Sequence, residues 1–113
     1  MKLTKVKITV MKLFGPEDVF GSNHDIRNLS GKLMTKCDLF KEGDEFIVET
    51  VMQMPDGFCG WAWRDIYKDL SVLYFDGHFH RVEKDMAYVS CTDGRKPVVF
   101  KLERIKEQMP RKG

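Results

Sequence analysis

Residues 61–75 read WAWRDIYKDLSVLYF, and the spacing of their apolar side chains decides the fold. Large apolar residues recur three or four positions apart, which is the period of one face of an α-helix. The members of this stripe are Trp63, Ile66, Tyr67, Leu70, Leu73 and Tyr74. Arg64 and Asp65 lie off the stripe, and Asp76-Gly77 supplies a C-terminal stop. The sequence therefore predicts one amphipathic helix over about 61–75.

Four other segments show the alternation of apolar and polar residues that is typical of strands. In residues 5–13, Val6, Ile8 and Val10 alternate with lysine and threonine, which places the branched side chains on one face. Similar patterns cover residues 45–52, 86–91 and 98–105. Asp93-Gly94 in the connection between the last two favours a tight reversal, so we predict an antiparallel hairpin there.

The remaining segments complete the predicted domain. Residues 16–20 begin with proline and predict a helical turn, whereas the rest of 15–36 is rich in Gly, Ser, Asn and Asp and predicts a surface loop. We expect one domain over residues 1–113, with a core over about 3–105 and a flexible tail over 106–113. The predicted fold is α+β: a small antiparallel, curled or barrel-like sheet packed on the one main helix.

Composition narrows the class of protein. The chain has 113 residues, of which 42% are hydrophobic, and this is too apolar for intrinsic disorder. A net charge of +2 argues against a dedicated nucleic-acid binder. No apolar run approaches the roughly twenty residues that cross a bilayer, so we expect no membrane segment. Three cysteines without CxxC spacing argue against a disulfide framework and favour the cytoplasm.

Residues 57–63, which read GFCGWAW, form the most unusual segment because they place a thiol and two tryptophans at the predicted helix start. Cys59 occupies a position that can make a thiol reactive. The alternative is a small buried side chain beneath the tryptophans. We also predict a pocket for a small molecule here, formed by the following residues: Cys59, Trp61, Trp63, Arg64 and Tyr67, with Asp93 and Arg95 from the hairpin turn.

Metal ligation is a second possibility for this region. Cys37, Cys59 and Cys91 all fall at the ends of predicted elements, where they could converge on zinc or an iron–sulfur cluster, although their spacing shows no paired ligands. His78 and His80 could chelate a metal from one side of an extended segment, or could be ordinary loop histidines. The sequence names no cofactor.

Several segments resemble those of a family of small uncharacterised prokaryotic proteins. They are Lys36-Cys37, the run 40–46, the run 57–63, the run 65–69 and the two parts 91–94 and 97–101 of the predicted hairpin. The resemblance implies a single compact cytoplasmic domain in which the three cysteines and the aromatic helix start are neighbours. The chain departs from the family pattern at Asp38 and Ser90, which weakens a dithiol mechanism.

Three hypotheses about function follow. The first is a cytoplasmic binding or accessory domain that uses the region from Gly57 to Tyr67 and the nearby turn from Thr92 to Arg95 to hold a small molecule or a protein partner. The second is a thiol- or metal-dependent redox or catalytic protein that uses the three cysteines. The third is a homo-oligomeric structural module joined through strand edges.

Overall fold

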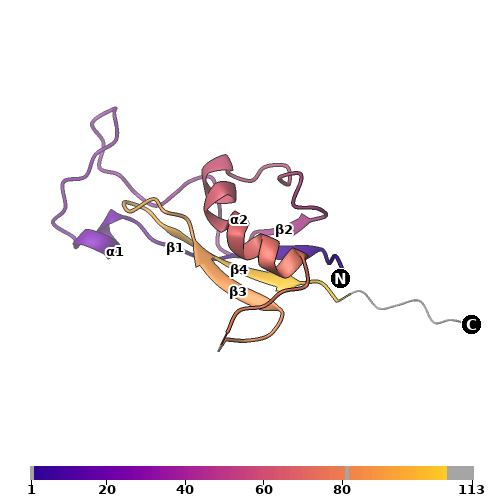
Figure 1. Ribbon diagram of the computed structural model, residues 1–113. Coiled ribbons are helices and arrows are strands. Elements are labelled where there is room, and N and C mark those ends of the chain that lie inside the picture. Colours follow the sequence, from indigo (N-terminus) through magenta and orange to yellow (C-terminus); the bar gives the residue numbers. More distant parts are fainter. Residues whose placement is uncertain (1, 81, 107–113) are drawn as a thin grey trace, which may run out of the picture.

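The chain forms an open antiparallel sheet with one main helix on one face, as a computed structural model shows (Figure 1). The structure describes residues 2–80 and 82–106. The elements are β1 (Val6–Leu13), α1 (Pro16–Phe20), β2 (Glu45–Val48), α2 (Gly60–Tyr74), β3 (Met86–Ser90) and β4 (Val98–Arg104). The α+β prediction is confirmed. The four strands do not close into a barrel, and residues 107–113 of the predicted tail lie outside the described residues.

The sheet has the strand order β2-β1-β4-β3, and every pairing is antiparallel. The alternation in β1 buries Val6, Ile8 and Val10 almost completely, while the intervening side chains face the other side of the sheet. A register shift between Val10 and Lys12 in the β1–β4 pairing accommodates an extra residue, which is the signature of a β-bulge. Most of the buried side chains of the sheet lie on its two central strands, β1 and β4.

The helix α2 covers the sheet with the stripe that its sequence predicts. Ile66, Leu70 and Leu73 are fully buried, and Tyr74 is nearly so. The first turn of the helix has no acidic residue, and its N-cap makes no side-chain hydrogen bond, so capping contributes little to its stability. The helix is stabilised mainly by the hydrophobic effect, through burial of this face. An aromatic cluster extends the core beyond the helix; its members are Phe40, Phe46, Phe58 and Phe100.

The second predicted strand is shorter than its sequence pattern indicates. Residues 45–52 alternate, but β2 ends at Val48 because Thr50 starts a turn. The Thr50 hydroxyl accepts a hydrogen bond from the Met52 amide at 3.1 Å, and its carbonyl accepts one from the Gln53 amide at 3.3 Å. This local side-chain bond competes with the strand ladder. The other predicted elements agree with the structure to within one residue at each end.

Residues 21–36, between α1 and the segment that leads to β2, belong to the predicted surface loop, and this loop extends away from the helix-covered part of the sheet (Figure 1). A bridge between Arg27 and Leu33 closes a small turn within it. The Asn28 carboxamide accepts hydrogen bonds from the amides of Ser30 and Lys32, which holds that turn. Within the part of the chain that the structure describes, no helix has the length and apolar character needed to cross a bilayer.

Candidate functional site

A pocket of about 350 Å³ opens beside the beginning of α2, and we call it the α2 pocket. Its walls come from three parts of the chain: the first turn of α2, the segment that leads to Phe40, and the turn between β3 and β4. These three parts lie on the same side of the fold (Figure 1). Phe40, Ala62 and Val98 give the pocket an apolar base that continues into the hydrophobic core.

All three cysteines line the α2 pocket. Cys37 comes from the segment before β2, Cys59 is the N-cap of α2, and Cys91 follows β3 directly. Each is half-buried, unpaired and packed against the core. The Cys91 sulfur accepts a hydrogen bond from the Val98 amide at 3.3 Å. The three thiols lie in the lining of one pocket because elements that are distant in sequence end beside it.

Metal binding by these thiols finds no support in the geometry. Among residues 2–80 and 82–106, no group of three or more Cys, His, Asp and Glu side chains is arranged to hold a metal ion. His78 and His80 lie in the loop after α2, outside the lining of the α2 pocket, and both are exposed.

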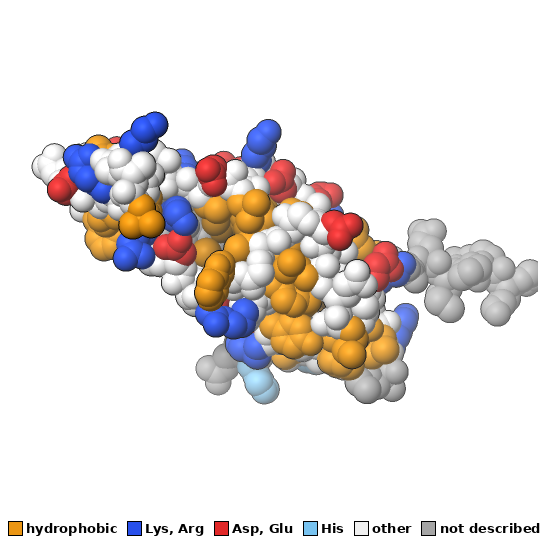
Figure 2. Space-filling view, turned by 90° about the horizontal axis from the view of Figure 1, so that it is seen from above, with side chains coloured by type: hydrophobic (Ala, Val, Ile, Leu, Met, Phe, Trp, Pro, Cys, Tyr) orange, Lys and Arg blue, Asp and Glu red, His pale blue; other side chains and the backbone are white. Residues whose placement is uncertain are grey.

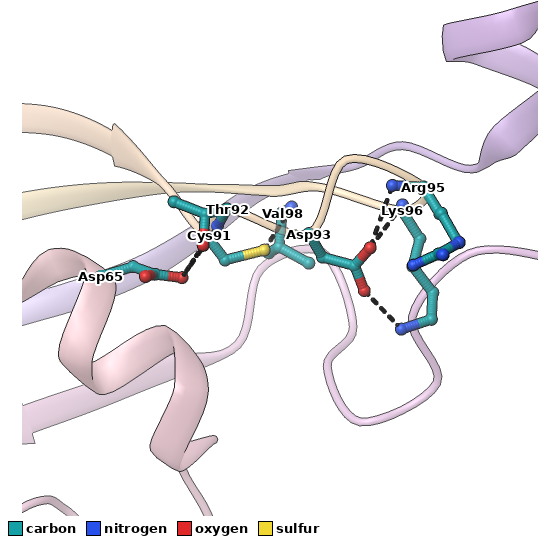
Figure 3. Close-up of polar contacts among 7 residues, drawn as sticks. All are labelled: Asp65, Cys91, Thr92, Asp93, Arg95, Lys96 and Val98. Atoms are coloured by element: carbon teal, nitrogen blue, oxygen red, sulfur yellow. Dashed lines mark hydrogen bonds and ion pairs between the residues drawn. The ribbon is translucent and has the colours of Figure 1, made fainter.

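A carboxylate on α2 fixes the position of the β3–β4 turn. The Asp65 Oδ2 atom accepts hydrogen bonds from the Thr92 amide at 2.8 Å and from the Thr92 hydroxyl at 3.0 Å (Figure 3). Both bonds join residues that are far apart in sequence, and charge-assisted bonds of this kind are stronger than neutral ones. The pocket wall formed by the turn is thus attached to the helix.

A second carboxylate organises the turn from within. Asp93 accepts hydrogen bonds from the amides of Arg95 and Lys96 at 3.0 and 3.4 Å, and from the Lys96 ammonium at 2.8 Å (Figure 3). Burial alone would raise the pKa of Asp93, but the bonds from Lys96 and the Arg95 amide outweigh it and lower that pKa. The turn is therefore built around an ionised carboxylate.

Lys96 extends this charge pair into the α2 pocket. Its hydrogen bond to Asp93 raises the pKa of Lys96 against the opposing effect of burial, and the negative charge of Asp93 raises it further, with a smaller effect in the same direction from the neighbouring Cys37 and Cys91. Because the pKa of Asp93 is lowered and that of Lys96 is raised, both partners stay charged throughout the neutral range. An ammonium group is thus held beside two of the three thiols.

Trp61 and Arg64 form the outer wall of the α2 pocket. The Trp61 side chain is 73% exposed, and the Arg64 guanidinium lies 5.3 Å from the centroid of its ring. Such a cation–π contact orders both side chains one helical turn apart. On the face of the molecule that carries α2, hydrophobic side chains gather with basic groups beside them (Figure 2). A large aromatic surface therefore stands open to solvent at the pocket entrance.

Comparisons of the chain with protein families, with curated proteins and with solved structures give no match. The α2 pocket is interpreted from its own geometry.

The structure separates the predicted site residues into two groups. Four of the predicted ligand-binding residues line the α2 pocket: Cys59, Trp61, Arg64 and Asp93. Trp63 and Tyr67 lie outside the lining; their rings contact each other at 5.7 Å between centroids, and the Tyr67 hydroxyl donates to the Val51 carbonyl at 3.1 Å. Arg95 also lies outside the lining and contributes its amide to Asp93.

Sequence reasoning missed Lys96 as a pocket residue, along with Phe40 and Val98, whereas Thr92 lies in the turn that the first hypothesis included. A signal for Lys96 was present, because an acid and a base three residues apart in a turn can form an ion pair of the kind that Asp93 and Lys96 make. The contact between Thr92 and Asp65 had no such signal, since the two residues are far apart in sequence.

Proposed function

We propose that this chain is a small cytoplasmic binding or accessory domain that holds a small molecule in the α2 pocket. The observation that supports the proposal is the convergence of distant segments on one concave site. Cys37, Cys59 and Cys91 belong to three different parts of the fold, yet all line the pocket together with Trp61 and Lys96. Concave sites with an apolar base and a few fixed polar groups are the usual form of ligand pockets.

The size and lining of the α2 pocket set limits on the ligand. A volume of about 350 Å³ lies near the lower end of the range for ligand pockets, so the ligand is small. The polar groups at the rim are held in place by the bonds of Asp65 and Asp93, which reduces the entropy lost when a ligand binds.

Nuclear magnetic resonance tests the binding proposal directly. In a screen of small metabolites against labelled protein, we expect shift changes concentrated at the amides of Trp61, Thr92 and Lys96. A Trp61→Ala variant should bind about tenfold more weakly, which corresponds to about 1.4 kcal/mol of lost aromatic contact. Tyr88→Ala is the matched control, because Tyr88 is exposed on β3 and does not line the pocket. Binding that maps elsewhere, or that survives Trp61→Ala unchanged, would contradict the proposal.

Thiol-dependent chemistry is a second candidate, and it is favoured specifically by the three thiols that line the α2 pocket, two of which lie near Lys96. A variant with alanine at Cys37, Cys59 and Cys91 separates the two candidates. The binding proposal expects this variant, once shown to be folded, still to bind its ligand in the α2 pocket, because Trp61 and Lys96 remain in the lining. Loss of binding in the triple variant, together with rapid alkylation of Cys59 in the unaltered protein, would support thiol chemistry instead.

A further inference from the structure

We infer that the α2 pocket takes a ligand that combines an aromatic ring with an anionic group, such as an aromatic carboxylate. This inference rests on the proposed binding function and adds the chemical class of the ligand. Two observations support it. Lys96 and Arg64 keep hydrogen-bond donors that no group in the described part of the chain uses, and the Trp61 ring is exposed at the entrance of the pocket.

The carboxylates of the α2 pocket are already engaged by the protein. Asp93 accepts three hydrogen bonds, two from backbone amides and one from Lys96. Asp65 accepts two bonds from Thr92, both at Oδ2. These bonds use most of the acceptor capacity of the two carboxylates. Of their four oxygens, only the Asp65 Oδ1 atom accepts none of them.

The basic groups of the α2 pocket keep most of their donors. An ammonium group has three N–H donors, and that of Lys96 uses one of them for Asp93. Arg64 has five donors and forms no ion pair with any residue that the structure describes; its guanidinium lies over Trp61 instead. The surplus of charged donors is complementary to an anionic acceptor.

The apolar surfaces favour a ring as the other part of the ligand. Trp61 presents a largely exposed indole, and aromatic rings associate with indole by offset stacking or edge contacts. Phe40, Ala62 and Val98 supply the apolar base on which such a ring can rest. The volume of about 350 Å³ limits the aromatic part to one or two fused rings.

Titration calorimetry with matched probes tests the ligand class. The probes are benzoate and 2-naphthoate, their neutral amides, and 2-naphthylmethylamine as the cationic analogue. We expect 2-naphthoate to bind at least about tenfold more tightly than 2-naphthamide, because a hydrogen bond to a charged partner contributes more than a neutral one. The amine should bind most weakly, since it meets Lys96 and Arg64.

Two variants show whether the preference arises in the pocket. Lys96→Met and Arg64→Met should each weaken 2-naphthoate binding by about tenfold or more and leave 2-naphthamide binding nearly unchanged. Lys101→Met is the matched control, because Lys101 pairs with Glu103 on β4 and does not line the pocket. Arg64→Met keeps the test valid if Lys96→Met disturbs the turn, since Arg64 makes none of the turn's hydrogen bonds.

The outcomes distinguish this inference from the binding proposal. Equal or tighter binding of the amide or the amine at the pocket amides would overturn the anionic class and leave the pocket proposal standing. If other metabolites bind in the α2 pocket and no aromatic acid does, the anionic class is likewise overturned and the pocket proposal stands. If no compound of any class shifts the amides of Trp61, Thr92 and Lys96, both the inference and the binding proposal fail.

Discussion

Replacing Phe100 with alanine is expected to lower the free energy of unfolding by about 3–5 kcal/mol. Phe100 is fully buried on β4, and its ring centroid lies 5.4 Å from that of Phe40 and 5.5 Å from that of Phe58. Truncation would leave a cavity where the sheet and the aromatic cluster meet. Because a domain of this size has only about 5–15 kcal/mol of stability, the variant should lose a large part of it.

Urea denaturation followed by circular dichroism measures this effect. Tyr88→Ala is the control, because it removes a similar ring from an exposed position and should cost about 1 kcal/mol or less. A loss below about 1 kcal/mol for Phe100→Ala would show that the aromatic cluster is not part of a tightly packed core.

Replacing Arg104 with methionine is expected to cost about 2–3 kcal/mol. The Arg104 Nη1 atom donates to the carbonyls of Leu73 and Gly77 at 2.7 Å each, and Nε donates to the Asp85 carboxylate at 2.9 Å. The side chain is only 9% exposed. One guanidinium thus connects β4 to the end of α2 and to the residue before β3, and methionine keeps the length of the side chain without these bonds.

Thermal unfolding of matched variants tests the role of Arg104. By the same substitution, Arg27→Met removes an exposed ion pair with Asp25 and an exposed hydrogen bond to the Gly31 carbonyl, and it should have only a small effect. Arg104→Lys should be intermediate, because a single ammonium group cannot reproduce the planar arrangement of three bonds. A loss for Arg104→Met no larger than that for Arg27→Met would contradict the prediction.

The effect of Arg104 should also depend on pH. Hydrogen bonds from Lys106 and Arg104 lower the pKa of Asp85 in the folded protein. A lowered pKa contributes stability above the unfolded-state pKa of about 3.9, and this contribution is lost as the pH falls through the folded-state pKa. The difference in stability between the unaltered protein and Arg104→Met should therefore shrink below about pH 4.

Local periodicity was sufficient to predict the elements of this fold. Val6, Ile8 and Val10 alternate because one face of β1 is buried, and Ile66, Leu70 and Leu73 recur at helical spacing for the same reason. The strand order β2-β1-β4-β3 could not be obtained this way, since pairing between distant strands depends on long-range packing. The early end of β2 depends on the Thr50 hydroxyl, a local bond that the alternation does not reveal.

The candidate site was predicted in part. The positions of the cysteines at the ends of elements left a shared neighbourhood possible, and the family resemblance implied one. Cys37, Cys59 and Cys91 do line one pocket. The stripe could not show that Trp63 and Tyr67 lie outside that pocket, because the edge of a helical face is set by the elements packed beside it. Lys96 was missed because its position depends on how Asp93 shapes the turn.

Cross-linking of the three thiols tests most directly whether the distant segments meet at the beginning of α2. The folded protein would be treated with a bifunctional thiol reagent whose span matches the width of the α2 pocket, and the linked peptides would be identified by mass spectrometry. The structure predicts intramolecular links among Cys37, Cys59 and Cys91 in the native protein that are lost when the chain is unfolded in urea. Single-ended adducts alone in the native protein would contradict the existence of this shared pocket.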